Sequence, residues 1–390
     1  MDEVSAPRPK IGLVLPGGGA RAAYQSGVLA GIAELLPPDS PLPFPVISGT
    51  SAGAINATII ATRAANFSHG ARELAAVWEN IRTDLVFRTD ALTIAKTLLY
   101  WSLSMLHWGL GRRNDVALLD NTPLRRLMER HVVFEHLQRA IRAGVLDALS
   151  LTCSSYMSGR AVSFYQAKHG LKPWHRTRRL GQPVELRLDH IMASVALPVM
   201  FPAVRIGREY YGDGSLRQVA PLSPVVHLGA DRILVIGVRD EKPVVLTGHG
   251  DEVPYPTFGQ VAGYLLDIVF SDSILADLER LERINLLIRE LRAHCAEPTP
   301  YREIRTLLIT PSANVHLIAQ RHTGEFPRNV RLLLRALGGT RKSGGQLLSY
   351  LLFEPGFCRE LVELGKHDAH AQADKLREFL GVTPPVPAGV

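Results

Sequence analysis

The first 36 residues show a short apolar run followed by a helical pattern of small and apolar side chains. Residues 10–15 predict a buried strand, and a loop with three successive glycines comes directly after it. The segment 20–36 predicts a helix, and its small side chains at positions 23, 27, 30 and 31 would let this helix lie close to a sheet. The order is therefore strand, glycine loop, helix.

The same order recurs further along the chain. Residues 45–48 predict a second strand, and residues 51–65 predict a second helix. Strands that alternate with helices favour a three-layer α/β/α fold, in which helices cover both faces of a mainly parallel sheet. Five more apolar stretches predict strands, at residues 145–156, 160–167, 203–213, 232–238 and 306–311.

Three other segments have a helical pattern. Residues 91–110 form the most apolar long window, but Lys96 and His107 interrupt it, so we interpret it as a helical cap or as core, with membrane-surface contact as the alternative. Residues 271–294 predict an amphipathic helix with leucines three and four positions apart. From about residue 325 onward, helical pieces separated by Gly and Pro form an extension without visible catalytic chemistry.

Composition and charge indicate the class of protein, its cellular location and its partners. The chain has 390 residues, of which 46% are hydrophobic, and this is enough for a sizeable core. The three cysteines are widely spaced, and the polar N-terminus lacks a signal-like apolar region. Both features favour a cytoplasmic location. A net charge of +7 favours anionic partners, but the sequence contains no nucleic-acid-binding motif, so we expect no nucleic-acid partner.

The pentapeptide Gly49-Thr50-Ser51-Ala52-Gly53 lies between the second predicted strand and its helix. In a sharp strand-to-helix turn, small residues two positions before and after a serine avoid steric clashes, and the serine hydroxyl projects above the sheet. The helix N-terminus also favours negative charge that develops there. The pattern therefore predicts that Ser51 is a nucleophile, although such a pentapeptide also occurs by chance.

The glycine loop has two interpretations. Successive glycines let backbone N–H groups turn towards an oxyanion or a phosphate. Gly17, Gly19 and Ala22 also fit the dinucleotide-binding fingerprint, which expects an acidic residue at the end of the second strand. The chain has Gly-Thr-Ser-Ala-Gly at that position, so the oxyanion interpretation is favoured.

A serine nucleophile needs a base, and Asp213 is one candidate. The dipeptide Asp213-Gly214 is also a signal for a hairpin turn. Among the 14 histidines, His190 and His227 are near enough in sequence to leave a Ser–His–Asp arrangement open.

Together, these motifs resemble those of the bacterial branch of the patatin-like phospholipase family. The resemblance rests on "GGGARA" for the glycine-rich motif, on "GTSAG" for the nucleophile elbow and on "DG" for the aspartate of the dyad. It extends into "LLDNTPLRRLM" and "ASVALPVMFPAVRIGREYYGDGS", and covers roughly residues 9–315. It implies a patatin-like fold over residues 9–315, with a helical cap around residues 91–130. Outside the resemblance, we expect an N-terminal tail at residues 1–8 and a helical C-terminal extension at residues 316–390.

The resemblance implies a Ser–Asp dyad without histidine, in which Ser51 attacks the acyl carbonyl and Asp213 accepts its proton. It assigns Gly49 and Gly53 to the elbow and Gly214 to the dyad turn. The oxyanion hole would consist of the N–H groups around Gly17, Gly18 and Gly19, with Arg21 at the cation position of the motif. Two departures from the family pattern are Ala22 and Ser215, which stand where the family has glycine and a smaller residue.

From the resemblance and the basic surface we expect a lipid acyl hydrolase that acts on a phospholipid or lysophospholipid. Pro198 and Phe201 are candidates for the wall of the acyl-chain pocket, with ordinary core packing as the alternative. No metal or cofactor is implied. We expect a cytoplasmic protein with peripheral contact at the inner face of the membrane, and a homodimer stays open. The alternatives are a thioesterase or carboxylesterase on soluble substrates, and a non-catalytic nucleotide- or lipid-binding protein.

Overall fold

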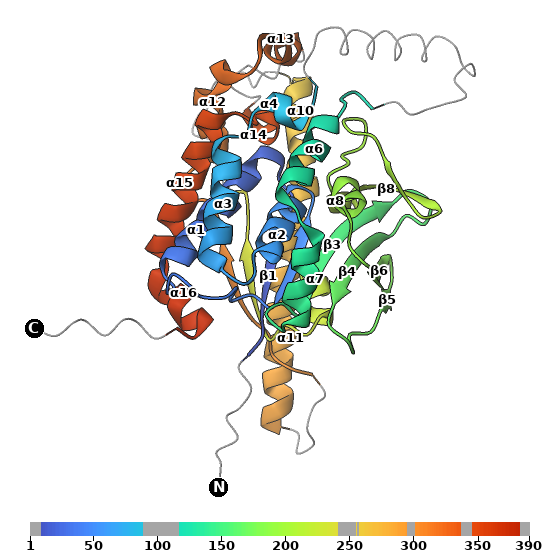
Figure 1. The fold of residues 1–390 in the computed structure, drawn as a ribbon, viewed down its shortest axis with the longest axis vertical. Coiled ribbons are helices and arrows are strands. Elements are labelled where there is room, and N and C mark those ends of the chain that lie inside the picture. The colour runs from blue at the N-terminus through green and yellow to red at the C-terminus, as the bar shows by residue number, and fades with distance from the viewer. Residues whose placement is uncertain are drawn as a thin grey trace, which may run out of the picture.

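A ten-stranded sheet lies at the centre of the computed structural model, which describes residues 9–88, 117–240, 255, 257–294, 301–336 and 345–382. The strand order is β10-β9-β1-β2-β3-β4-β6-β5, and a hairpin of β7 and β8 joins through β3 (Figure 1). The strands are β1 Ile11–Leu15, β2 Val46–Thr50, β3 Ala148–Ser155, β4 Ala161–Ala167, β5 Trp174–Arg176, β6 Arg179–Pro183, β7 Val204–Ile206, β8 Glu209–Asp213, β9 Arg232–Ile236 and β10 Arg305–Ile309.

The predicted α/β fold with a mainly parallel sheet is confirmed. Strands β10, β9, β1, β2 and β3 are parallel neighbours, whereas β4 and β8 both run antiparallel to β3. Side chains alternate between the faces of the sheet: Leu13 and Leu15 of β1 join one hydrophobic cluster, and Val14 joins the other. Helices cover both faces because both are apolar.

The layer in front of the sheet in Figure 1 contains helices from both ends of the chain. It contains α1 Ala23–Glu34, α2 Ala52–Thr62, α3 Phe67–Glu79 and α15 Pro355–Ala371. The opposite face is covered by α9 Ser223–His227 and α11 Ser273–His294, whose Val225, Ile274 and Leu278 belong to the second cluster.

Two of the small residues of α1, Gly27 and Gly31, serve a different contact from the predicted one. A Cβ atom added at Gly27 would lie 2.0 Å from the carbonyl oxygen of Val362, and one at Gly31 would lie 2.7 Å from the Cβ of Ala369. Both neighbours belong to α15, so these glycines bring α1 close to a C-terminal helix and not to the sheet.

The remaining elements connect these layers. They are η1 Gly19–Ala22, α4 Thr83–Val86, α6 Thr122–His131, α7 Phe134–Arg142, α8 Leu188–Ser194, η2 Gly214–Leu216, α10 Phe258–Asp267, the π-turn η3 Ile268–Asp272, α12 Val315–Arg321, η4 Thr323–Glu325, α13 Arg328–Ala336, α14 Gly345–Leu351 and α16 Ala373–Leu380. The window 91–110 predicted as a cap lies outside the described residues. The division into a tail, a domain and an extension stays a prediction.

The local structure differs from the sequence-based prediction in two places. Residues 203–213 form the two strands of a hairpin, which turns at Gly207 with φ of 63°. Strands β5 and β6 were not predicted, because their residues are mostly polar or basic.

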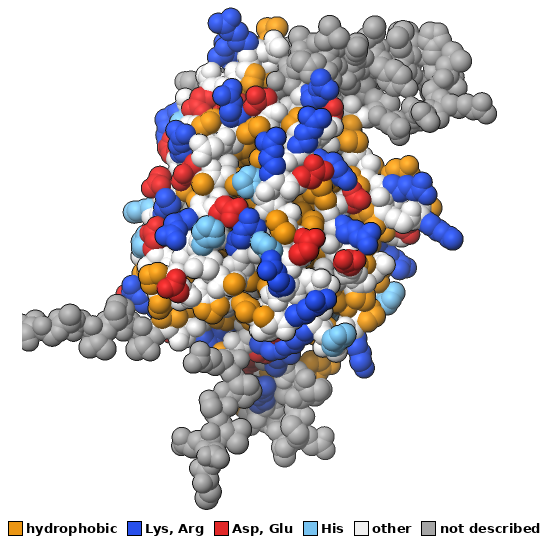
Figure 2. Space-filling model, in the orientation of Figure 1, with side chains coloured by type: hydrophobic (Ala, Val, Ile, Leu, Met, Phe, Trp, Pro, Cys, Tyr) orange, Lys and Arg blue, Asp and Glu red, His pale blue; other side chains and the backbone are white. Residues whose placement is uncertain are grey.

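Among the described helices, none is long and apolar enough to cross a bilayer. On the face drawn in Figure 2, Lys and Arg are interspersed with Asp and Glu, so this face carries no purely basic patch.

Candidate active site

Ser51 lies in the sharp turn between β2 and α2. Its backbone has φ of 53° and ψ of −130°, a conformation that non-glycine residues rarely adopt. The flanking glycines are required by close backbone contacts: a Cβ at Gly49 would lie 2.5 Å from the carbonyl oxygen of Gly53, and one at Gly53 would lie 2.1 Å from that of Leu15. Strain of this kind is typical of functional sites.

The sheet brings Asp213 to Ser51 from 162 residues away. Asp213 ends β8 and is paired with Cys153 of β3, which is itself the parallel neighbour of β2. The Ser51 hydroxyl donates a hydrogen bond to Oδ2 of Asp213 over 2.5 Å. The other oxygen, Oδ1, accepts from the backbone N–H of Ser215 at 2.9 Å. The dipeptide Asp213-Gly214 therefore leads from a strand into η2 and forms no hairpin turn.

Burial controls the electrostatics of this carboxylate. Asp213 is 1% exposed. Desolvation raises its pKa to about 6, although the hydrogen bonds from Ser51 and from the Ser215 backbone oppose this rise. The carboxylate is consequently ionised at neutral pH and more basic than an exposed aspartate.

Ser194 is a further residue of the site, and the sequence motifs gave no sign of it. Its hydroxyl accepts a hydrogen bond from the backbone N–H of Ser51 at 2.9 Å and donates one to the carbonyl of Thr152 at 2.7 Å. It therefore fixes the strained peptide at the nucleophile. The stretch "ASVALP" that contains it was singled out only through the family resemblance.

The glycine loop lies beside the pair of Ser51 and Asp213. Gly19, with φ of 54°, lines the same pocket as these two residues. A Cβ at Gly17 would lie 2.6 Å from the Ser215 hydroxyl oxygen, so this glycine lies against the segment that follows Asp213. Ala22 has φ of −65°, so alanine fits here without strain.

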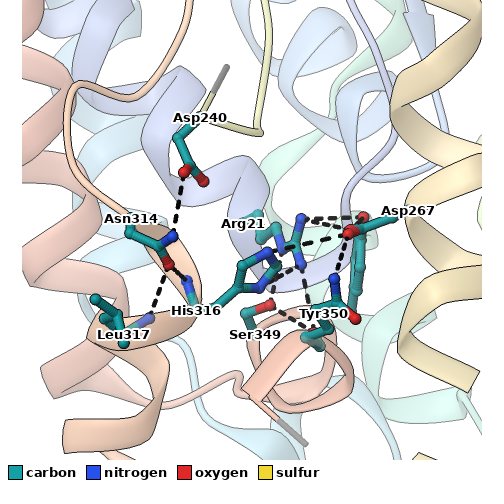
Figure 3. Close-up of polar contacts among 9 residues, drawn as sticks. Arg21, Asp240, Asp267, Asn314, His316, Leu317, Ser349 and Tyr350 are labelled. Carbon is teal, nitrogen blue, oxygen red and sulfur yellow. Dashed lines mark hydrogen bonds and ion pairs between the residues drawn. The ribbon is translucent and has the colours of Figure 1, made fainter. Parts of the chain in front are cut away.

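The resemblance placed Arg21 at the oxyanion hole, but the structure corrects this assignment. The Arg21 side chain points to the C-terminal helices (Figure 3). It is fully buried and pairs with Asp267 of α10 at 3.0 Å. It also donates to the hydroxyls of Ser349 at 2.8 Å and Tyr350 at 3.0 Å, and its guanidinium lies 3.7 Å from the centre of the Tyr350 ring. Nη2 lies 3.1 Å from Nδ1 of His316, whose pKa is lowered to about 4 by burial and by Arg21.

An apolar pocket opens from Ser51 and Asp213. Phe201 lines it as predicted, but Pro198 does not contribute to its wall. The C-terminal helical region, which showed no catalytic chemistry in the sequence, supplies part of that wall. The pocket is lined by Gly19, Ser51, Ala52, Ile55, Val77, Trp78, Ile81, Val86, Leu124, Leu127, Met128, Val195, Leu197, Phe201, Asp213, Leu266, Phe270, Tyr350, Leu351 and Phe353.

Comparison with known protein families gives a match to one described as "Patatin-like phospholipase", over residues 13–226. This match spans more than half of the chain and includes the glycine loop, Ser51 and Asp213. The chain belongs to the patatin-like phospholipase family. The predicted membership of the family is thereby confirmed, whereas the bacterial branch stays a prediction. Membership supports the hydrolysis of lipid acyl esters.

Two solved structures are similar to this patatin-like protein. VipD from Legionella pneumophila has a TM-score of 0.39 and 13% identity, with coverage of 95% of this chain and 68% of that one. Human GIVD cytosolic phospholipase A2, in complex with methyl γ-linolenyl fluorophosphonate, has a TM-score of 0.42 and 13% identity, with coverage of 96% and 59%. At these scores neither structure adds to the family assignment. The search among curated proteins found no match.

The two histidines considered as alternative bases are engaged elsewhere in the patatin-like domain. His190 accepts a hydrogen bond at Nδ1 from the backbone N–H of Arg187, and its ring packs against Phe164. The His227 ring stacks on Trp174, with 4.9 Å between ring centres. Burial lowers the pKa of both, to about 4 for His227. In the described part of the chain, no group of three or more His, Cys, Asp or Glu residues could hold a metal ion.

Proposed function

We propose that this protein is a lipid acyl hydrolase of the phospholipase A or lysophospholipase type, and that Ser51 and Asp213 are its catalytic dyad. The observation that carries the proposal is the 2.5 Å hydrogen bond between the strained Ser51 hydroxyl and a buried carboxylate whose pKa is about 6. A hydroxyl in this position is activated by the adjacent base, and the base is ionised at neutral pH.

In the proposed reaction the Ser51 oxygen attacks the acyl carbonyl carbon while its proton passes to Asp213. The negative charge on the carbonyl oxygen is stabilised by backbone N–H groups of the loop Gly17–Gly19 and by the N-terminus of α2. The alcohol part of the substrate leaves with the proton from Asp213. Water then attacks the acyl-enzyme, Asp213 accepts a proton from the water, and Ser51 recovers its proton as the fatty acid leaves.

The apolar wall of the pocket supports an acyl chain as the group bound beside Ser51. Its apolar side chains come mainly from α2, α3, α4, α6, α10, η3 and α14 and from the segment after α8. Among the described lining residues, the ionisable or nucleophilic side chains are Ser51, Asp213 and the Tyr350 phenol. Such a wall favours a long hydrocarbon chain over a polar acyl group. Membrane contact, a cytoplasmic location and the oligomeric state stay predictions.

The test measures fatty acid released from phosphatidylcholine vesicles and from lysophosphatidylcholine. We expect release by the wild-type protein and a loss of at least about 1000-fold in Ser51→Ala, because the nucleophile is removed. Folding of the variant is checked by circular dichroism. Equal release by both proteins would contradict the proposal. Turnover of acyl-CoA or short p-nitrophenyl esters without release from either lipid would favour a thioesterase or carboxylesterase instead.

A further inference from the structure

A chain of three buried side chains connects the acyl pocket to the glycine loop. Trp78, a residue of the pocket wall, donates its indole N–H to Oδ1 of Asn56 at 2.7 Å. The Asn56 amide donates to Oε1 of Gln25 at 2.9 Å and to the carbonyl of Ala22 at 3.0 Å. The Gln25 amide donates in turn to the carbonyl of Pro16 at 2.9 Å.

The direction of every hydrogen bond in this chain is determined. An indole N–H can only donate, so the oxygen of the Asn56 amide must face Trp78. Its NH₂ group then faces the oxygen of the Gln25 amide, and the NH₂ group of Gln25 faces two carbonyls, the second being that of Ile236 at 3.1 Å. Both amides use both of their hydrogens. Trp78 is 2% exposed and the two amides are fully buried, so each lost bond leaves an unsatisfied polar group.

This series of hydrogen bonds, from Trp78 through Asn56 and Gln25, ends at a peptide group of the glycine loop. The described residues contain no cis peptide bond, so the N–H of Gly17 points away from the Pro16 carbonyl in the same rigid plane. Fixing the Pro16 carbonyl therefore also fixes the direction of the Gly17 N–H. Asn56 fixes the other end of the loop through the Ala22 carbonyl, and Gly19 between these anchors lines the pocket beside Ser51.

We infer that Gln25 and Asn56 are positioning residues, which hold the glycine loop ready for an oxyanion and link it to the acyl-pocket wall through Trp78. This inference rests on the proposed function. Oxyanion stabilisation depends on donors that are already oriented before charge develops, and both amides donate to carbonyl groups at the two ends of the glycine loop.

The decisive variant is Gln25→Met, which keeps approximately the same side-chain volume and removes every hydrogen bond of the amide. Loss of one oxyanion donor costs about 100- to 1000-fold in kcat, and a misaligned loop costs less, so we expect kcat to fall about 10- to 100-fold. KM should change by less than about threefold, because Gln25 does not itself line the acyl pocket. Amide hydrogen exchange, measured by mass spectrometry, should become faster in peptides that cover residues 16–22.

Ser26→Ala is the matched control, because Ser26 is buried on the same helix and its hydroxyl donates only to the Ala23 carbonyl within that helix, at 2.7 Å. It should leave kcat and loop exchange within about twofold of the wild type. If Gln25→Met behaves like this control, the inference is overturned.

If Gln25→Met does not fold, Trp78→Phe decides, since it keeps an aromatic wall and removes only the far end of the chain. A fall in kcat of at least about threefold with faster loop exchange supports the inference, and unchanged values overturn it. If the wild type releases no fatty acid, the proposed function fails separately. Loop exchange alone then decides, because faster exchange in Gln25→Met supports the positioning role and unchanged exchange overturns it.

Discussion

The Asp213 carboxylate combines two requirements that oppose each other in water. A base must be ionised at neutral pH, yet it must hold a proton more firmly than an exposed carboxylate does. Complete burial raises its pKa, and hydrogen bonds from Ser51 and from the Ser215 backbone limit the rise, so that the value lies at about 6. The residue can therefore both accept and return a proton during one turnover.

The pH dependence of activity should report this group directly. Because only the ionised carboxylate accepts a proton, kcat/KM should rise with pH and reach half of its plateau near pH 6. The measurement is hydrolysis of a neutral monomeric ester between pH 4 and 9, which avoids changes in vesicle charge. A profile that is flat across this range would contradict Asp213 as the base.

The stability of the folded protein should fall as the pH rises, whereas the activity should increase. A carboxyl group with a raised pKa binds its proton more tightly in the folded protein, so stability is lost as pH rises from 3.8 through about 6. The expected loss in the free energy of unfolding is about 3 kcal/mol. Urea unfolding at several pH values should show that Asp213→Asn removes this part of the pH dependence.

At the scale of elements, the contact between α1 and α15 makes the C-terminal region part of the fold. Gly27 and Gly365 face each other: a Cβ at Gly365 would lie 2.3 Å from the Tyr24 carbonyl oxygen and 2.7 Å from the Val28 backbone nitrogen. Tyr24 also donates its hydroxyl to Asp368 at 2.9 Å. Backbone atoms cannot withdraw as a flexible side chain can, so the two helices have no space for a larger residue.

Gly365→Ala should therefore destabilise the protein by about 1–3 kcal/mol, since the added methyl group forces α1 and α15 apart. Gly324→Ala is the control, because a Cβ there meets nothing within 4 Å and the expected change is within about 0.5 kcal/mol. Urea unfolding of both variants measures the difference. Equal stability would show that the two helices are not packed as described.

The elements that could be predicted from the sequence are those whose signal is local. The strand, turn and helix around Ser51 are encoded by adjacent residues, and the glycine loop follows an apolar run in the same way. The sequence predicts a single strand where β7 and β8 form a hairpin, because the residues on both sides of Gly207 have the same β-like pattern. Polar strands such as β6 carry no hydrophobic alternation and were missed.

At the scale of the whole molecule, the site is assembled from segments that pattern alone does not connect. Arg21 was assigned to the oxyanion hole from its place in a motif, but its partner Asp267 is 246 residues away. The wall of the pocket includes Tyr350 and Phe353, from a region that carried no motif. The turn pattern alone predicts Ser51 as a nucleophile, but the choice of Asp213 over His190 or His227 as its base depended on the family resemblance.

The measurement that tests the dyad most directly is labelling by a fluorophosphonate probe, followed by identification of the labelled peptide. The account predicts one modified residue, Ser51, in the wild type, and labelling at least about 100-fold slower in a folded Asp213→Asn variant, because the hydroxyl has then lost its base. Labelling of Ser51 at the same rate in both proteins, or of a different serine, would contradict the account.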